Sequence, residues 1–449
     1  MDRIAVIELG EIPVGQVVDE PPARPWPHRR WALMALAIGL ALVTVAGSAP
    51  AARPLPMVVL DVSTDSAVLA TTDRVFVVDQ DRVETGRGRD RYVTAYRLMN
   101  LEQLWRVDLP VDGVAVGPLA SADTIVVSRL DFATPPDGQP GSGPETAALD
   151  AATGAVLWRH EGSAEAWTSA GHLLMSFPAG PAADGESGRY RHILRAVSSH
   201  TGDVLWSAEV PAGALWTHRY DGDRVALLAL ILPGGRIELR DPNTGTLVRA
   251  GQIAAPSPGH PAELSAEIVG DLLLVRERAA VAAYPLDRLD LRWRLPLQDG
   301  DNSWPTSCDD ALCFIDERGG LRNVDPQTGR VRWSDRRWMN VLGTVDGSLL
   351  VGEHDPRTDG VRVVALDPDT GQVRHDLGTW DGLDRNGQDE WLIGYQFNLT
   401  RALVSRVDPA RGAWVLGVLH DVSRSCRVQQ PMLLCRRTDN TVGVWRLPG

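Results

Sequence analysis

Beyond residue 56, apolar and polar residues alternate in short runs that are interrupted by turn-forming residues. Residues 348–352 and 361–366 are two such runs, and Asp, Pro, Thr and Gly follow the second one. A hydrophobic period of two predicts strands with one buried face, and clusters of turn residues predict tight connections between them. This part of the chain therefore predicts an all-β structure.

The connections repeat one motif, Asp-x-x-Thr-Gly, with Trp four residues after the Gly. The motif is complete at residues 150–158 and 325–333, and residues 198–206 carry Ser in place of Asp. Residues 241–249 and 367–375 keep the turn but end in Arg and His. The turn and docking residues selected on this basis are Asp150, Gly154, Trp158, Gly202, Trp206, Asp241, Gly245, Asp325, Gly329, Trp333, Asp367 and Gly371, together with Trp105 and Trp293 at the ends of degenerate copies.

Each residue type in this motif has a mechanical reason. Asp accepts hydrogen bonds from the backbone N–H groups two or three residues on, and a following Pro fixes φ near −65°. Gly supplies the position with φ above zero, so the turn closes without strain. Trp then falls on the last strand of the unit, where a large flat ring can pack between neighbouring sheets.

The last residue of the motif recurs at intervals of 40 to 53 residues between positions 105 and 375. A period in this range is typical of β-propellers, in which thin sheets stack radially and so bury both faces. Seven motif ends, plus an irregular unit in residues 390–449, predict about eight four-stranded blades, with seven and nine as alternatives. Residues 56–61 are expected to add a strand that pairs the start of the ring with its end.

The unit resembles the propeller repeat of pyrroloquinoline-quinone (PQQ) enzymes, whose consensus contains Ala-Leu-Asp-x-x-Thr-Gly. Residues 148–154 and 365–371 match it, and the resemblance extends over residues 57–449. It implies a PQQ-like β-propeller, WD40-like in architecture. Such repeats occur in quinone-dependent dehydrogenases and also in cofactor-free scaffolds, including outer-membrane assembly lipoproteins and sensor domains of receptor kinases. The whole layout resembles membrane-anchored PQQ-like repeat proteins of high-GC bacteria.

The N-terminal region predicts a membrane anchor. Residues 31–49 contain no charged side chain, and as a helix they would be about 28 Å long, close to the hydrocarbon thickness of a bilayer. Three arginines shortly precede this run and one follows it, so the positive-inside rule places residues 1–30 in the cytoplasm and the remainder outside. The expected order is a cytoplasmic tail, a single-pass transmembrane helix, a linker over residues 50–56 and the propeller from residue 57 to residue 449. A secretory signal peptide cleaved near Ala49 is the alternative.

The four cysteines form two local pairs, Cys308 with Cys313 and Cys426 with Cys435. Each pair brackets a turn between apolar runs, and facing positions of an antiparallel hairpin are close enough for a disulfide. A zinc site is the alternative, but neither pair has the C-x₂-C spacing that such sites use. We expect two hairpin disulfides, which fits an oxidising, extracytoplasmic compartment.

No motif in the sequence predicts catalysis. There is no Gly-x-Ser-x-Gly, no His-x-x-x-His and no adjacent pair of cysteines of the kind found in many quinone dehydrogenases. Residues 299–302 and 381–387 carry closely spaced carboxylates, but neither loop completes a calcium-binding pattern. We therefore expect no catalytic residues, no metal site and no cofactor, neither PQQ nor calcium.

Charge narrows the choice of partners. The chain has 58 acidic and 45 basic residues, a net charge of -13, which argues against a nucleic-acid partner because such proteins need a basic footprint. We expect a non-catalytic binding or scaffold module on the outer side of the cytoplasmic membrane, with a protein or envelope ligand on the propeller face. Two other hypotheses remain open: a sensor that signals to a cytoplasmic partner, and a PQQ-dependent oxidoreductase.

Overall fold

The computed structural model describes much of the chain beyond residue 53. The described residues are 54–60, 62, 66–79, 92–109, 115–129, 144–181, 190–253, 265–277, 280–297, 305–315, 320–355, 360–385, 392–429 and 432–447. Contacts divide the chain into two compact units, Met1–Ala52 and Arg53–Gly449. The expected cytoplasmic tail and transmembrane helix lie outside the described residues. Within the described ranges, no helix has the length and apolarity needed to cross a bilayer.

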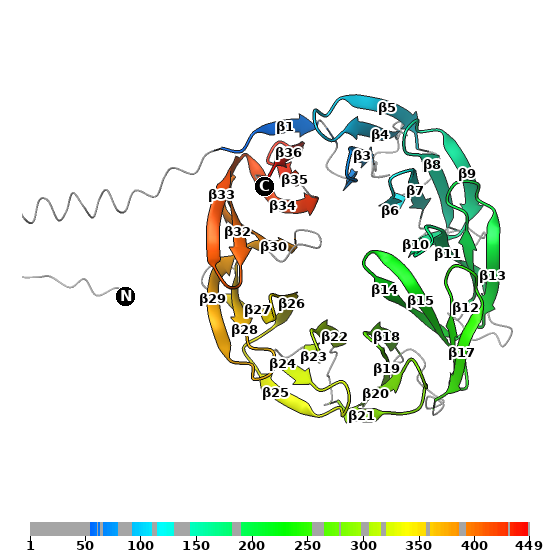
Figure 1. The fold of residues 1–449 in the computed structure, drawn as a ribbon. Helices are drawn as coiled ribbons and strands as arrows, with labels where there is room; N and C mark the ends of the chain where they lie inside the picture. Colours follow the sequence, from blue (N-terminus) through cyan, green and yellow to red (C-terminus); the bar gives the residue numbers. More distant parts are fainter. Residues whose placement is uncertain are drawn as a thin grey trace, which may run out of the picture. The chain divides into compact units, whose positions relative to one another are not determined.

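Regular secondary structure in the described residues consists entirely of strands, arranged as a ring of sheets (Figure 1). Seven sheets are separate and four-stranded, and an eighth contains two four-stranded halves. The halves are joined by a short parallel pairing of Trp167 with Arg224. We call each four-stranded unit a blade and number the blades 1 to 9 along the ring.

The strands of blades 1 to 5 follow one another in chain order. They are β2 (Ala67–Ala70), β3 (Arg74–Val78), β4 (Tyr92–Arg97) and β5 (Gln103–Asp108) in blade 1; β6 (Ala115–Ala120), β7 (Thr124–Arg129), β8 (Glu145–Asp150) and β9 (Val156–Glu161) in blade 2; β10 (Ser163–Thr168), β11 (Leu173–Pro181), β12 (Tyr190–Val197) and β13 (Val204–Val210) in blade 3; β14 (Leu215–Asp221), β15 (Arg224–Ile231), β16 (Arg236–Arg240) and β17 (Leu247–Gln252) in blade 4; β18 (Ser265–Val269), β19 (Leu272–Glu277), β20 (Ala280–Pro285) and β21 (Trp293–Pro296) in blade 5.

Blades 6 to 8 repeat this order, and blade 9 combines both ends of the ring. The strands are β22 (Pro305–Cys308), β23 (Ala311–Ile315), β24 (Leu321–Val324) and β25 (Val331–Asp335) in blade 6; β26 (Asn340–Val345), β27 (Ser348–Asp355), β28 (Gly360–Leu366) and β29 (Val373–Trp380) in blade 7; β30 (Gly382–Arg385), β31 (Leu392–Asn398), β32 (Arg401–Asp408) and β33 (Gly412–His420) in blade 8; β34 (Val422–Gln429), β35 (Met432–Arg437), β36 (Val442–Arg446) and β1 (Met57–Leu60) in blade 9.

The first strand closes the ring. β1 pairs with β36 in antiparallel register, from Met57 opposite Trp445 to Leu60 opposite Val442. It is the outermost strand of blade 9, whereas in every other blade the chain begins on the innermost strand (Figure 1). The expectation that residues 56–61 supply a closing strand is confirmed.

The described strands make nine blades, so the expected number of about eight was one too low and the alternative of nine holds. The difference lies in residues 390–449, interpreted as one irregular blade, which hold most of blade 8 and three strands of blade 9. Asp408 begins a turn that ends at Gly412 and has Arg in place of Thr. Its carboxylate accepts hydrogen bonds from the N–H groups of Ala410 and Arg411, as in the complete motif. Because the Thr is missing, the boundary of blade 8 was not visible in the sequence.

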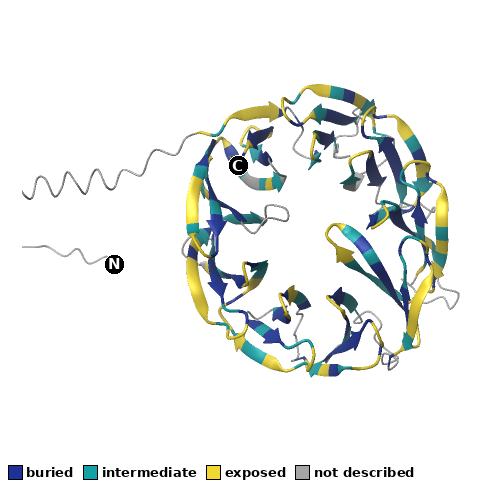
Figure 2. Ribbon diagram, viewed as in Figure 1, coloured by how far each residue is buried: buried dark blue, intermediate teal, exposed yellow. Residues whose placement is uncertain are grey.

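The hydrophobic core lies between neighbouring blades. One cluster joins Phe76 and Val93 of blade 1 to Ile125 and Leu149 of blade 2, and a similar cluster joins blade 9 to blade 1. The middle strands are therefore mostly buried, while the outermost strands are mostly exposed or half-buried (Figure 2). Each buried aliphatic side chain contributes about 1.5–3 kcal/mol, so the ring depends on contacts between sheets rather than within them.

Candidate functional site

Five tryptophans dock the outermost strand of one blade onto the next blade along the chain. In the first, Trp105 of β5 donates a hydrogen bond from Nε1 to the carbonyl oxygen of Ala151, in the turn between β8 and β9, at 3.1 Å. The other four bonds run from Trp158 to Ser199 (2.9 Å), from Trp206 to Pro242 (2.9 Å), from Trp293 to Pro326 (2.8 Å) and from Trp333 to Pro368 (2.8 Å). We call this arrangement the tryptophan lock.

The Asp of the motif holds the turn that receives the ring. Asp367 accepts hydrogen bonds from the N–H groups of Asp369 (3.0 Å) and Thr370 (2.9 Å) and from the Thr370 hydroxyl (3.0 Å). The side chain of Arg374 also donates to it at 2.6 Å. The hydrogen bonds from Arg374 and Thr370 lower the pKa of Asp367 to about 2. The same bonds to backbone and Thr hydroxyl are made by Asp150 and Asp325, and Asp241 makes those to the backbone.

The Gly of the motif is required twice over. Gly154 has φ of 75°, a conformation that costs other residues roughly 1–2 kcal/mol. In addition, a Cβ atom there would lie 2.6 Å from Cε3 of Trp105, closer than atoms approach. The same conflict with the docked ring exists at Gly202, Gly245, Gly329 and Gly371, each with positive φ.

The lock is missing between blades 4 and 5. Arg249 occupies the Trp position on β17 and is exposed. In the receiving turn of blade 5, Leu289 donates its N–H to Pro285 O at 2.7 Å, as Gly154 does to Asp150 O in blade 2. Leu289 has positive φ (61°) and is 2% exposed. Its side chain packs against Gly251 of β17, so an aliphatic side chain from the turn replaces the ring from the strand.

Both expected disulfides are present in the described residues. Cys308 and Cys313 join β22 to β23 with a Cα–Cα distance of 5.7 Å. Cys426 and Cys435 face each other on β34 and β35 with a Cα–Cα distance of 4.0 Å. Each bridge therefore closes one hairpin within a blade.

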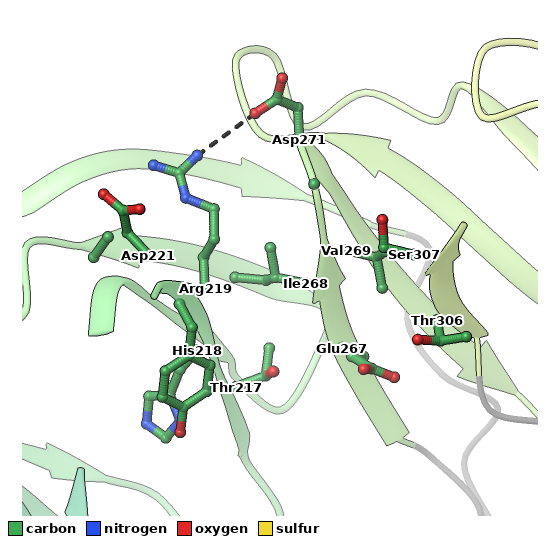
Figure 3. A pocket seen from close by; sticks show the side chains of 13 residues that line it. Thr217, His218, Arg219, Asp221, Glu267, Ile268, Val269, Asp271, Thr306 and Ser307 are labelled. Atoms are coloured by element: carbon green, nitrogen blue, oxygen red, sulfur yellow. Dashed lines mark ion pairs between the residues drawn. The ribbon is translucent and has the colours of Figure 1, made fainter. Parts of the chain in front are cut away.

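A cavity of about 670 Å³ lies on the innermost strands of blades 4, 5 and 6 (Figure 3). We call it the inner-strand cavity. β14 contributes residues 217–221, β18 and its turn contribute residues 267–271, and β22 contributes Thr306 and Ser307. These strands are the ones nearest the middle of the ring (Figure 1), so the cavity adjoins the blade 4–5 boundary at which the lock is missing.

His218 of β14 is neutral at pH 7. Burial lowers its pKa to about 4, and in the described part of the chain its Nε2 atom has no hydrogen-bond partner. The ring stands edge-on to Tyr220, with ring centroids 6.0 Å apart. Burial, followed by the charge of Glu165, raises the pKa of Tyr220. His218 and Tyr220 are therefore polar but uncharged at pH 7.

Two carboxylates of β18 and its turn are in different states. Asp271 is 97% exposed and forms an ion pair with Arg219 of β14 at 3.6 Å (Figure 3). Glu267 is half-buried, and among the described residues it has no ion-pair or hydrogen-bonding partner. Burial raises the pKa of Glu267. Val269, two residues further along β18, packs against blade 6. Because side chains two residues apart on a strand share one face, Glu267 also points toward blade 6, where Thr306 lies.

The carboxylate loops serve the fold where the structure describes them. Asp381 accepts a hydrogen bond from the N–H of Phe397 at 2.6 Å, and Asp384 accepts one from the N–H of Val428 at 3.0 Å. Residues 299–302 lie outside the described ranges, as do residues 386 and 387. Over the described ranges, no three His, Cys, Asp or Glu side chains are grouped as a metal ion would need.

The selected residues all belong to the turns, the docking positions and the disulfides, and sequence reasoning missed the inner-strand cavity. The innermost strands carry no repeated motif, because the side chains that they present to the ring axis differ from blade to blade. One signal was present: residues 217–221 read Thr-His-Arg-Tyr-Asp, five polar side chains in succession within a strand that precedes a strongly apolar one. Such a run indicates a strand with two solvent-accessible faces.

Comparison with known proteins gives a family match and distant structural matches. The family model described as outer membrane protein assembly factor BamB matches residues 61–229 and 233–391. A eukaryotic initiation factor structure is 11% identical, covers 84% of this chain and 94% of its own, and has a TM-score of 0.54, which shows a shared fold. BamB from Moraxella catarrhalis is 14% identical over 88% of this chain and 97% of its own, with a TM-score of 0.43. The C-terminal WD40 domain of Sif2 is 11% identical over 89% and 99%, with a TM-score of 0.41. No curated protein sequence matches the chain.

Proposed function

The chain belongs to the PQQ-like β-propeller family described as outer membrane protein assembly factor BamB, and we propose that it is a membrane-anchored scaffold outside the cytoplasm. In this proposal the propeller binds a protein or an envelope ligand and catalyses no reaction. The family match supports a scaffold or assembly role, because it extends across most of the ring. Residues 31–49 supply the anchor and residues 1–30 a short cytoplasmic tail.

The observation that carries the proposal is the inner-strand cavity in an otherwise closed ring. Five boundaries are fastened by tryptophan locks, so the blades form a stiff frame that holds the cavity-lining strands in place. The cavity is lined by a half-buried carboxylate, that of Glu267, which has no partner within the described residues. Polar groups left without partners in a concave site are suited to recognition of a ligand.

The two disulfides support export of the propeller. Disulfides form and persist in oxidising compartments and are rare in the cytosol. In a reducing compartment the same cysteines would remain thiols. Together with the distribution of arginines around residues 31–49, this favours a propeller outside the membrane and an N-terminus inside.

Site-specific photo-crosslinking in cells tests the scaffold role. A photo-reactive amino acid is placed at Thr217 or Ser307 in the cavity, and at exposed Val248 on outer strand β17 as the control. We expect a discrete crosslinked product from the cavity positions and none from position 248. External protease added to spheroplasts should degrade the propeller while a tag on the N-terminus survives. A propeller that resists protease until the membrane is lysed would refute the proposed location, and equal crosslinking from all positions would refute the cavity as the binding face.

A further inference from the structure

We propose that the inner-strand cavity binds a guanidinium or primary ammonium group and that Glu267 is the anionic group that pairs with it. The inference deepens the proposed function and rests on it, because it names the chemistry that a partner would present to the propeller. It follows from Glu267 and from the charges and hydroxyl groups of the other side chains that line the cavity on blades 4, 5 and 6.

Glu267 is the starting point because its carboxylate lacks the partner that a half-buried charge needs. It lies on β18, in the middle of the three strands that line the cavity, and the described residues give it no ion pair and no hydrogen bond. Partial burial disfavours a charged carboxylate unless a cation or several donors compensate it. A ligand that brings a positive charge into the cavity supplies that compensation.

The surrounding groups accept hydrogen bonds without repelling a cation. Thr306 of β22 lies on the side to which Glu267 points, and Thr217 of β14 lines the cavity across β18. His218 is neutral at pH 7 because burial lowers its pKa to about 4. A guanidinium carries five N–H donors and an ammonium three. Hydroxyl oxygens and a carboxylate can accept them, whereas an anionic ligand would meet Glu267 at close range.

The only cation among the lining residues is already compensated. Arg219 pairs with Asp271 at the rim, as the dashed line in Figure 3 shows. Asp221 lines the cavity as well, so the described lining residues carry three carboxylates and one guanidinium. The cavity volume of about 670 Å³ falls in the range of roughly 300–1,000 Å³ that is typical of ligand sites, and exceeds what one arginine or lysine side chain occupies.

The first test measures binding of defined probes to the full-length protein in detergent by calorimetry. The probes are a blocked Gly-Arg-Gly peptide, the same peptide with citrulline in place of arginine, and agmatine. Citrulline keeps the shape but not the charge of arginine. We expect the arginine peptide to bind at least about tenfold more tightly than the citrulline peptide. Agmatine that binds as tightly as the arginine peptide identifies a small molecule as a sufficient source of the cation, whereas tighter peptide binding identifies a polypeptide.

The second test compares Glu267→Gln with Glu209→Gln, a control at an exposed position on outer strand β13. Glu267→Gln keeps the volume and removes a charge that burial disfavours, so the unfolding midpoint should stay the same or rise. Binding of the arginine peptide should fall by at least about tenfold in Glu267→Gln and remain unchanged in Glu209→Gln. Unchanged binding in Glu267→Gln, or equal binding of the citrulline peptide, overturns the inference.

Failure of the inference can be distinguished from failure of the proposed function. If neither the arginine peptide nor agmatine binds at about 1 mM, the weak end of specific recognition, the cation site is refuted. Photo-crosslinking from Thr217 would then still report whether the cavity faces a partner. If the probes fail but a partner is crosslinked, only the proposed chemistry of the cavity is refuted. If the probes fail and no partner is crosslinked, the scaffold proposal is refuted as well.

Discussion

The boundary between blades 1 and 2 and the boundary between blades 4 and 5 solve the same packing problem in opposite ways. In the first, Trp105 extends from the outer strand onto a turn kept flat by Gly154. In the second, the turn supplies the bulk through Leu289, and the strand makes room with Gly251. The large group and the glycine have exchanged sides. What is lost in the exchange is the indole hydrogen bond, which ties one blade to the backbone of the next.

The difference between these two boundaries indicates how one ring can combine rigid blade boundaries with an accessible cavity. A locked boundary fixes the distance and angle between sheets through a hydrogen bond and a large buried ring. The blade 4–5 boundary relies on aliphatic contacts, which are less directional, and the inner-strand cavity lies at this boundary. We infer that the locks maintain the frame, while blades 4 to 6 supply the surface that the frame presents.

Removing a locking ring should have the largest effect. Trp105→Ala deletes a side chain that is 9% exposed together with its hydrogen bond to Ala151. The loss should lower the free energy of unfolding by about 3–5 kcal/mol, as measured by urea denaturation. Trp414→Ala is the control, because that ring on β33 is 38% exposed and makes no lock. A similar loss in both variants would mean that the lock adds nothing beyond an ordinary aromatic contact.

Lowering the pH should have the second-largest effect on stability, through His218 of blade 4. Because burial lowers the pKa of His218 from 6.5 to about 4, the unfolded chain binds more protons than the folded one between these values. Stability should therefore fall as pH drops from about 6.5 to about 4, by at most on the order of 3 kcal/mol. His218→Gln removes the titrating group and should flatten this part of the pH profile of unfolding. An unchanged slope in the variant would show that other groups control it.

Substituting the glycine that receives the ring at a locked boundary should have an intermediate effect on stability. Gly154→Ala combines the strain of φ at 75° with a collision against Trp105, and should cost about 2 kcal/mol. Gly171→Ala is the matched control, because its φ is 79° but nothing lies within 4 Å of the added Cβ; it should cost about 1 kcal/mol. Equal losses in chemical denaturation would show that the ring yields to the methyl group.

Leu289→Gly tests the other side of the exchange. The substitution removes a side chain that is 2% exposed but relieves the strain of its positive φ. Loss of the buried leucine should exceed the relief, so the net cost should be about 1–3 kcal/mol. Adding Arg249→Trp to this variant should restore stability, because the ring would then meet a glycine as it does at the five locked boundaries. If the double variant is less stable than Leu289→Gly alone, the two boundaries do not share one geometry.

The turns and docking positions could be read from the sequence because the same physical problem is solved there several times. Asp, Gly and Trp recur at fixed offsets, so both the type of blade and the closing strand follow from the pattern. The cavity could not be read in the same way, because Glu267 and Thr306 lie on different blades and come to line one cavity only through the stacking of those blades. The blade count failed for a related reason: the turn beginning at Asp408 keeps the geometry of the motif but not its Thr.

The smallest expected effect concerns a turn carboxylate. Hydrogen bonds from Arg374 and Thr370 lower the pKa of Asp367 from 3.8 to about 2, so its contribution to stability is fully present above about pH 4 and is lost as pH falls through 2. Asp367→Asn should therefore be less stable than the wild type at neutral pH, and the difference should shrink toward zero between pH 4 and pH 2. Asp123→Asn, at an exposed position, is the control variant in the same urea denaturation series. Because Asp367 is at the surface, salt should also reduce the difference. A difference that persists at pH 2 would mean that the turn depends on the shape of the Asp367 side chain rather than on its charge.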